Sequence, residues 1–208
     1  MRTLAFDGRM GAAGDMILGA LLAAGADRDA LAPVEQALDV EYVVSTVDRN
    51  GISATGVEVI LTDPTTDGGE DQDGRDGHEH DHEDHDHSHD GGHDHATPAE
   101  GHGPHRSYPE VVDIVEGMDL PDAVAADALA IGEILGTAEA AVHDTDLEET
   151  HFHEVGADDA IADVVGATLL LADLDVDRVV TTPVSAGGGT VSMSHGTYPV
   201  PTPAVVEI

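Results

Sequence analysis

Residues 67–106 constrain the fold most, because this internal stretch contains almost no apolar side chains. It consists mainly of Gly, Asp, Glu and His, and it holds ten of the chain's fourteen histidines. Such a segment cannot bury enough apolar surface to offset the entropy of ordering. We therefore expect a disordered insertion at 67–106 in one α/β or α+β domain, whose mixed sheet and packed helices come from residues 1–66 and 107–208.

The two flanking parts carry recognisable strand and helix signals. Residues 3–6 favour a buried strand, followed by a glycine-rich turn and a helix that Gly25 would end. Asn50-Gly51 lies between two runs of β-branched residues, which indicates a hairpin. Beyond the insertion, Ser107 favours a helix start, and residues 178–182 favour another strand.

Acidic residues outnumber basic ones throughout the chain. The sequence has 43 Asp and Glu against seven cations, all Arg, and a formal net charge of −36; only 13 of the acids lie within residues 67–106. In ordinary salt this self-repulsion would loosen a compact state, whereas molar salt shortens the Debye length to about 3 Å. We expect a protein of a salt-rich cytoplasm. Because no basic patch exists, a nucleic-acid partner is not expected.

The sequence also lacks cysteine, a signal peptide and a membrane-spanning run. The chain has no cysteine, which excludes disulfides, thiolate metal sites and cysteine catalysis. Its N-terminus turns acidic at Asp7, unlike a signal peptide, and its longest apolar runs fall short of the roughly 20 residues of a membrane span. Metal binding in this chain must therefore rest on histidine and carboxylate side chains.

The insertion is the first candidate metal site. Imidazole suits nickel, zinc and copper, and a flexible tract can gather several imidazoles around one ion, although the affinity order does not select one metal. The alternative is a solvated spacer with adventitious affinity; the internal position and the interleaved carboxylates favour metal binding. The candidate ligands are His78, His80, His82, His85, His87, His89, His93 and His95.

His151-Phe152-His153-Glu154 is the second candidate. Histidines two apart lie on one face of an extended segment, as two ligands of one ion require. Gly156 is expected to break this strand, and Asp159 and Asp163 lie one turn apart at the start of the next helix. The alternative is that the histidines are hydrogen-bonded strand residues and the aspartates are first-turn residues that suit the helix dipole.

Glycine-rich turns are candidate anion sites. Gly11, Gly14 and Asp15 stand between the first strand and the first helix, where free backbone N–H groups converge. Their spacing matches neither the dinucleotide fingerprint nor the P-loop, so a tight turn is the simpler interpretation. A second such turn, residues 183–190, precedes His195, a further candidate metal ligand.

Four motifs follow one another along the chain. They are Asp7 with Gly11, Gly14 and Asp15; the His-rich tract before Arg106-Ser107-Tyr108; His151 to Ala157; and His195-Gly196 with Pro199-Val200-Pro201 and Pro203-Ala204. In this order they closely resemble the N-terminal half of the LarC family of nickel insertion proteins. The resemblance covers essentially the whole chain.

The resemblance implies a lyase-type metal-insertion enzyme. Its reaction would place nickel into pyridinium-3,5-bisthiocarboxylic acid mononucleotide, using CTP, to form the nickel-pincer cofactor of lactate racemase. The matching positions do not by themselves assign roles. Our hypothesis is that nickel is bound by His151, His153 and His195. The ring proton would be accepted by Glu154, Asp159 or Asp163. The substrate's phosphate would bind the turn from Gly11 to Gly14. Ala160 stands where the family usually has Ser, which excludes a hydroxyl role there.

The family's members are much longer than this chain, and some are made as two pieces. The resemblance therefore implies a C-terminal half or subunit that carries the CTP site. Pro203 is placed to begin a helix only a few residues before the end of the sequence, which agrees with a continuing segment or subunit. A homo-oligomer stays open. The competing classes are a nickel or zinc storage or delivery protein without catalytic activity, and a partner-docking module.

Overall fold

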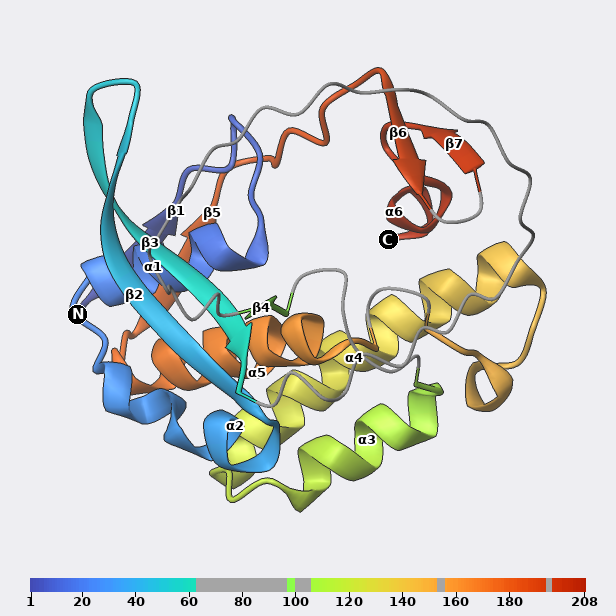
Figure 1. Ribbon diagram of the computed structural model, residues 1–208, viewed down its shortest axis with the longest axis horizontal. Helices are drawn as coiled ribbons and strands as arrows, with labels where there is room; N and C mark the ends of the chain where they lie inside the picture. The colour runs from blue at the N-terminus through green and yellow to red at the C-terminus, as the bar shows by residue number, and fades with distance from the viewer. Residues whose placement is uncertain (63–96, 100–105, 153–155, 194–195) are drawn as a thin grey trace, which may run out of the picture.

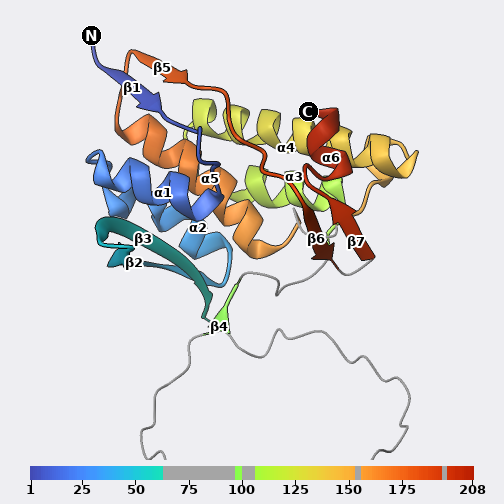
Figure 2. The ribbon, with the colours of Figure 1, turned by 90° about the horizontal axis from the view of Figure 1, so that it is seen from above.

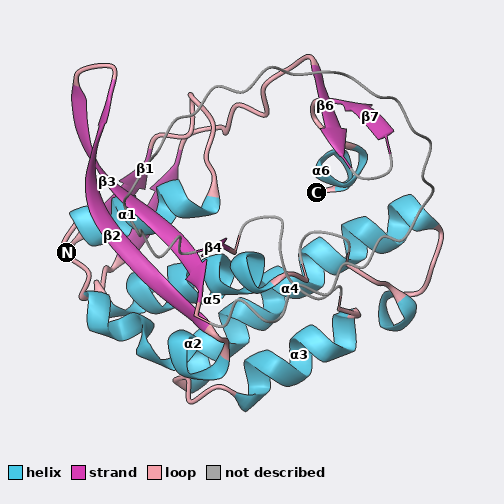
Figure 3. Cartoon of the chain, in the orientation of Figure 1, coloured by secondary structure: helices cyan, strands magenta, loops and turns pink. Residues whose placement is uncertain are grey.

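The computed structural model describes residues 1–62, 97–99, 106–152, 156–193 and 196–208. Figure 3 shows the helices and strands of the chain, which come largely in runs of one kind. In order they are β1 (Thr3–Phe6), α1 (Gly14–Ala23), the 3₁₀ turn η1 (Arg28–Leu31), α2 (Ala32–Ala37), β2 (Val40–Arg49), β3 (Ile52–Leu61), β4 (Thr97–Pro98), α3 (Tyr108–Gly117), α4 (Asp122–His143), the 3₁₀ turn η3 (Leu147–Glu149), α5 (Asp158–Asp173), β5 (Arg178–Thr181), β6 (Thr190–Met193), β7 (Gly196–Pro199) and α6 (Pro203–Glu207).

The mixed α/β class is confirmed, but the described strands form three separate sheets where one mixed sheet was expected. β1 pairs in parallel with β5, β2 and β3 form an antiparallel hairpin joined by β4, and β6 pairs with β7. Figures 1 and 2 explain the separation, because α1 and α5 lie between the β1–β5 pair and the β2–β3 hairpin. The two sheets therefore cover opposite sides of a helical layer and cannot share hydrogen bonds.

Local signals position most elements. The hairpin turn has φ of 55° at Asn50 and 82° at Gly51, the left-handed pair that Asn-Gly favours in a two-residue loop. A capping box starts α3, in which the Glu110 carboxylate accepts hydrogen bonds of 2.7 Å from both the amide and the hydroxyl of Ser107. These two expectations are confirmed, whereas the β6–β7 hairpin was missed.

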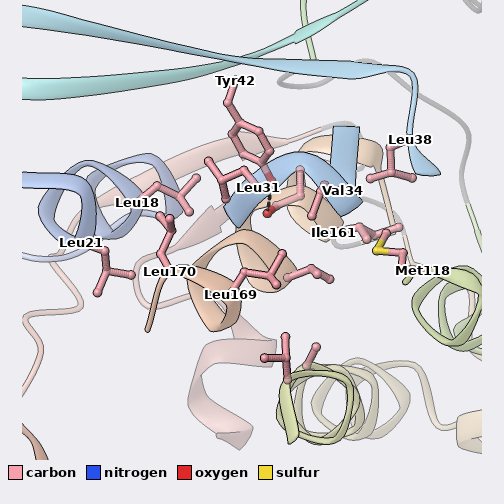
Figure 4. Close-up of a cluster of buried hydrophobic side chains, with 14 of the residues drawn as sticks. Leu18, Leu21, Leu31, Val34, Leu38, Tyr42, Met118, Ile161, Leu169 and Leu170 are labelled. Atoms are coloured by element: carbon pink, nitrogen blue, oxygen red, sulfur yellow. Dashed lines mark hydrogen bonds between the residues drawn. The ribbon is translucent and has the colours of Figure 1, made fainter. Parts of the chain in front are cut away.

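The core surrounds α5, whose buried side chains face α1, α2 and the β2–β3 hairpin. Figure 4 shows Leu18, Leu31, Val34, Leu169 and Leu170 meeting there. At its centre the Tyr42 hydroxyl donates a 2.6 Å hydrogen bond to the Ala162 carbonyl. Burial raises the pKa of Tyr42, and the charge of Asp163 acts in the same direction. The phenol therefore stays protonated and holds the hairpin on α5.

Close approach of α5 to the hairpin depends on Gly166. A Cβ atom there would lie 2.7 Å from the Tyr42 hydroxyl oxygen, 3.1 Å from Leu18 Cδ2 and 3.2 Å from Leu31 Cδ2. These atoms belong to fully buried side chains. The absence of a side chain at residue 166 thus permits the Tyr42 hydrogen bond. Within the described part of the chain, no helix is long and apolar enough to cross a membrane.

Two helix-interior glycines give a matched stability test. Gly166→Ala should destabilise the fold by about 1–3 kcal/mol, because the added methyl group displaces Tyr42 or its neighbours in a packed core. Gly132→Ala in α4 should stabilise it by about 0.5–1 kcal/mol, because among the described residues no atom beyond the adjoining turns of its own helix lies within 4 Å of the added Cβ, and alanine favours helix. Urea unfolding at high salt measures both, and equal effects would contradict this packing.

Candidate functional site

His151 has an exposed side chain on a firmly anchored backbone. Its neighbours Thr150 and Phe152 are only 2% and 1% exposed. The Thr150 hydroxyl donates to the Asp146 carbonyl at 2.9 Å, and the Phe152 ring meets Tyr108 edge to face at 6.3 Å between centroids. Because both neighbours are held in the interior, the His151 side chain is presented outward from a defined position.

The described part of the His151 segment, up to Phe152, is not the strand that was expected. The described residues before it form the 3₁₀ turn η3, and His151 makes a single isolated antiparallel bridge with Ser107. Around that bridge, the Phe152 amide donates to the Arg106 carbonyl at 2.9 Å, and the Tyr108 amide donates to the Thr150 carbonyl at 3.0 Å. Among the described residues on either side, the pairing extends no further than this bridge.

This pairing brings the end of the His-rich stretch to His151. Arg106 is the last residue of the range 67–106 that the sequence marked as the insertion, and its carbonyl bonds the residue next to His151. The described end of the insertion therefore lies beside the His151 segment, although 45 positions separate residues 106 and 151. Sequence reasoning did not predict this contact.

Arg106 also makes a largely buried ion pair that sequence reasoning missed. Its Nη2 lies 2.6 Å from Asp158 Oδ1, with only 16% and 14% of the two side chains exposed. Its Nη1 donates to the Gly156 carbonyl at 2.9 Å. A signal was available in the sequence, because the chain has only seven arginines and Arg106 is the last residue of the His-rich stretch.

Glu110 adds a negative charge near His151. Hydrogen bonds from the Ser107 side chain and backbone lower the pKa of Glu110, and the charges of His151 and Arg106 act in the same direction. The carboxylate is therefore ionised at neutral pH, which favours a cation at this end of α3.

Asp159 and Asp163 lie on the first two turns of α5, as expected, and both are partly buried. Asp163 packs directly on Gly14, the first residue of α1; a Cβ there would lie 1.8 Å from Asp163 Oδ2. A carboxylate of the chain itself thus occupies the space beside the start of α1. Helix N-termini favour negative charge, so Asp163 suits this position.

Gly11 belongs to a second cluster, at the carboxyl ends of β1 and β5. There the Gly8 amide donates to Thr182 Oγ1 at 2.9 Å, and the Ser185 amide donates to the Gly8 carbonyl at 2.9 Å. Hydrogen bonds from Arg9 lower the pKa of the exposed Asp7 carboxyl. The two glycine-rich turns therefore meet where ligands commonly bind in α/β proteins, outside the carboxyl ends of parallel strands. Asp15 is exposed nearby on α1.

Several predicted site residues lie outside the described residues. These are His153, Glu154, His195 and the tract histidines His78, His80, His82, His85, His87, His89, His93 and His95. Within the ranges that the structure does describe, no three His, Asp or Glu side chains are grouped to hold a metal ion. His151 would therefore need further ligands to make a complete site.

The contact between Gly14 and Asp163 is testable by a double-mutant cycle. Gly14→Ala should destabilise the wild-type chain by about 1–3 kcal/mol, because the new methyl group overlaps the Asp163 carboxylate. In an Asp163→Gly background the same substitution should be neutral or stabilising, since the overlapping atoms are gone. Urea unfolding measures both costs; an equal cost in the two backgrounds would refute the contact.

The comparisons with known proteins agree on one family. The family model described as nickel insertion protein matches residues 4–208. A putative nickel insertion protein of Methanococcoides burtonii is 37% identical over the whole chain, and one of Picosynechococcus is 42% identical over 95% of it. A protein of Nocardioides, named pyridinium-3,5-bisthiocarboxylic acid mononucleotide nickel insertion protein, is 37% identical over the whole chain. No solved structure matches.

The aligned region is only part of those proteins. The chain spans 43% of the Methanococcoides protein and 44% of each of the other two. It aligns over nearly its full length with each of them, and the match includes the turn at Gly11 and the segment at His151. The chain belongs to the nickel insertion protein family.

Proposed function

We propose that this chain is the nickel-handling part of an enzyme that inserts nickel into pyridinium-3,5-bisthiocarboxylic acid mononucleotide. The family and the name of the Nocardioides relative support this substrate. The observation that carries the proposal is the pairing of residues 106–108 with residues 150–152, which puts the end of the His-rich tract beside His151. The tract would collect nickel, and His151 would receive it.

Ligand softness gives this transfer its direction. Imidazole nitrogen binds nickel well but reversibly, whereas the two sulfur donors of the nucleotide are softer and compete strongly for the ion. Nickel would move from the tract to His151 with His153, joined by His195, and then to sulfur. An exposed imidazole on an anchored backbone fits such a relay, because a substrate can approach it without the segment unfolding.

Formation of a carbon–nickel bond on the pyridinium ring releases a ring proton, which a base must accept. Carboxylates are suitable acceptors. Our candidates are Glu154, Asp159 and Asp163; of these, the partly buried Asp159 and Asp163 lie on the first turns of α5, the helix that follows the His151 segment.

The substrate's phosphate would bind the turn that includes Gly11, with Gly14 and Asp15 at the start of α1. The meeting of this turn with the turn after β5 supports the proposal, because backbone amides from both lie at one edge. Asp163 beside Gly14 favours the Gly11 side of the turn, since a second anion at Gly14 would be repelled.

The complete reaction would need more than this chain. We propose that CTP is the co-substrate and that it binds a C-terminal half or subunit corresponding to the rest of the relatives' length, the product being the nickel-pincer cofactor of lactate racemase. We place the reaction in a salt-rich cytoplasm, because a net charge of −36 is tolerated best when salt screens it.

Replacing His151 tests the relay. His151→Ala should lower the insertion rate by about 10-fold or more, as losses around metal sites do, while most equilibrium nickel binding remains on the tract. The matched control is His143→Ala, at the end of α4, where His143 lies 3.4 Å from Glu139. The assay supplies nickel, CTP, the nucleotide and the C-terminal part of the Nocardioides relative. Wild-type insertion by His151→Ala would end the proposal.

Deleting residues 67–95, which leaves β4 and the buried Ala99 in place, tests the collecting role of the tract. Nickel loading at limiting metal should weaken, because eight of the ten histidines of residues 67–106 are gone, while far-ultraviolet circular dichroism and the unfolding midpoint stay unchanged. Loss of the fold would instead make the segment structural. A wild-type chain that binds nickel without ever transferring it would be a storage protein.

A further inference from the structure

Two arginines in this chain each contact one carboxylate and one backbone carbonyl. Arg106 pairs with Asp158 and donates to the Gly156 carbonyl. Arg28 pairs with Glu35, through contacts of 2.9 and 2.6 Å, and donates to the Tyr42 carbonyl at 3.0 Å. Only the Arg106 pair borders the His151 segment, so the Arg28 pair is an internal reference for what such a contact contributes to the fold alone.

Arg106 connects three parts of the chain at once. Its backbone carbonyl accepts a hydrogen bond from the Phe152 amide. Its side chain donates from Nη1 to the carbonyl of Gly156, just before α5, and pairs through Nη2 with Asp158, the first residue of α5. A Cβ at Gly156 would lie 3.2 Å from the Arg106 carbonyl oxygen and 2.8 Å from Phe152 Cβ, so the approach is close. The end of the tract, the His151 segment and the start of α5 are therefore held as one unit.

We propose that Arg106 is a positioning residue for nickel transfer: its pair with Asp158 sets His151 relative to the start of α5, which carries Asp159 and Asp163. The inference rests on the proposed function. It adds a residue that touches neither metal nor substrate and acts through the backbone that follows His151, at Phe152 and Gly156.

The planar guanidinium explains why arginine is needed. Its two terminal nitrogens reach a carboxylate and a carbonyl together in a fixed fork, whereas a lysine ammonium is a single point charge on a flexible stem. Lysine at residue 106 can keep the ion pair with Asp158 but loses the simultaneous bond to Gly156. The substitution keeps the positive charge at residue 106, but it no longer fixes the backbone of the His151 segment.

The test compares Arg106→Lys with Arg28→Lys in the full chain. Both should lower the unfolding midpoint modestly. Arg106→Lys alone should reduce the insertion rate by about 10- to 100-fold, the range for residues that orient metal ligands, with equilibrium nickel uptake unchanged. Arg28→Lys should insert nickel at the wild-type rate.

A spectrum separates positioning from general stability. The visible absorption of the nickel-loaded wild type minus that of loaded His151→Ala isolates the contribution of His151. The spectrum of nickel-loaded Arg106→Lys should lack the absorption that His151 contributes. The spectrum of nickel-loaded Arg28→Lys should contain it. If Arg106→Lys keeps this absorption and inserts nickel at the wild-type rate while His151→Ala is defective, the role of Arg106 is overturned and the proposed function stays intact. A fully active His151→Ala would overturn both.

Discussion

The backbone pairing of residues 106–108 with residues 150–152 is the contact on which the candidate site depends. It is short, but buried neighbours reinforce it, because Phe152 is only 1% exposed. A Cβ at Gly136 would lie 2.7 Å from Leu147 Cδ1, 3.0 Å from Tyr108 Cδ2 and 3.3 Å from Phe152 Cζ, so glycine at this position lets α4 pack closely against these side chains. With Phe152 fixed inward, the His151 side chain faces outward. A packing requirement of the core thus presents a metal-binding side chain at the surface, at the point where the His-rich stretch rejoins the fold.

Helix α5 relates the two parts of the candidate site. Its first residue pairs with Arg106, its second turn places Asp163 against Gly14, and its middle packs on Tyr42 at Gly166. The Tyr42 hydrogen bond to Ala162 fixes the helix against the hairpin from the opposite side. Because protein interiors are close-packed, movement of α5 would shift both the His151 segment and the turn at Gly11. The proposed transfer of nickel to a bound nucleotide needs such a fixed relation between two sites.

Sequence reasoning predicted what local chemistry decides. Asn50-Gly51 specified the hairpin, Ser107 the start of α3, and Pro203 the start of α6. It missed what distant contacts decide. The parallel pairing of β1 with β5 joins residues about 175 positions apart, and no local pattern reveals it. The Arg106–Asp158 pair was missed because any of the many acids could have been the partner, and His151 was assigned to a strand because a His-x-His spacing suits one.

Paramagnetic nickel offers the most direct measurement of the central claim, that the tract and His151 form one nickel path. Substoichiometric nickel, added to isotope-labelled chain at high salt, should broaden the amide signals of residues 106–108 and 150–152 together, and spare those of the distant β2–β3 turn. Broadening that leaves residues 150–152 untouched at every nickel concentration would contradict the account, because nickel would then be held by the chain without reaching His151.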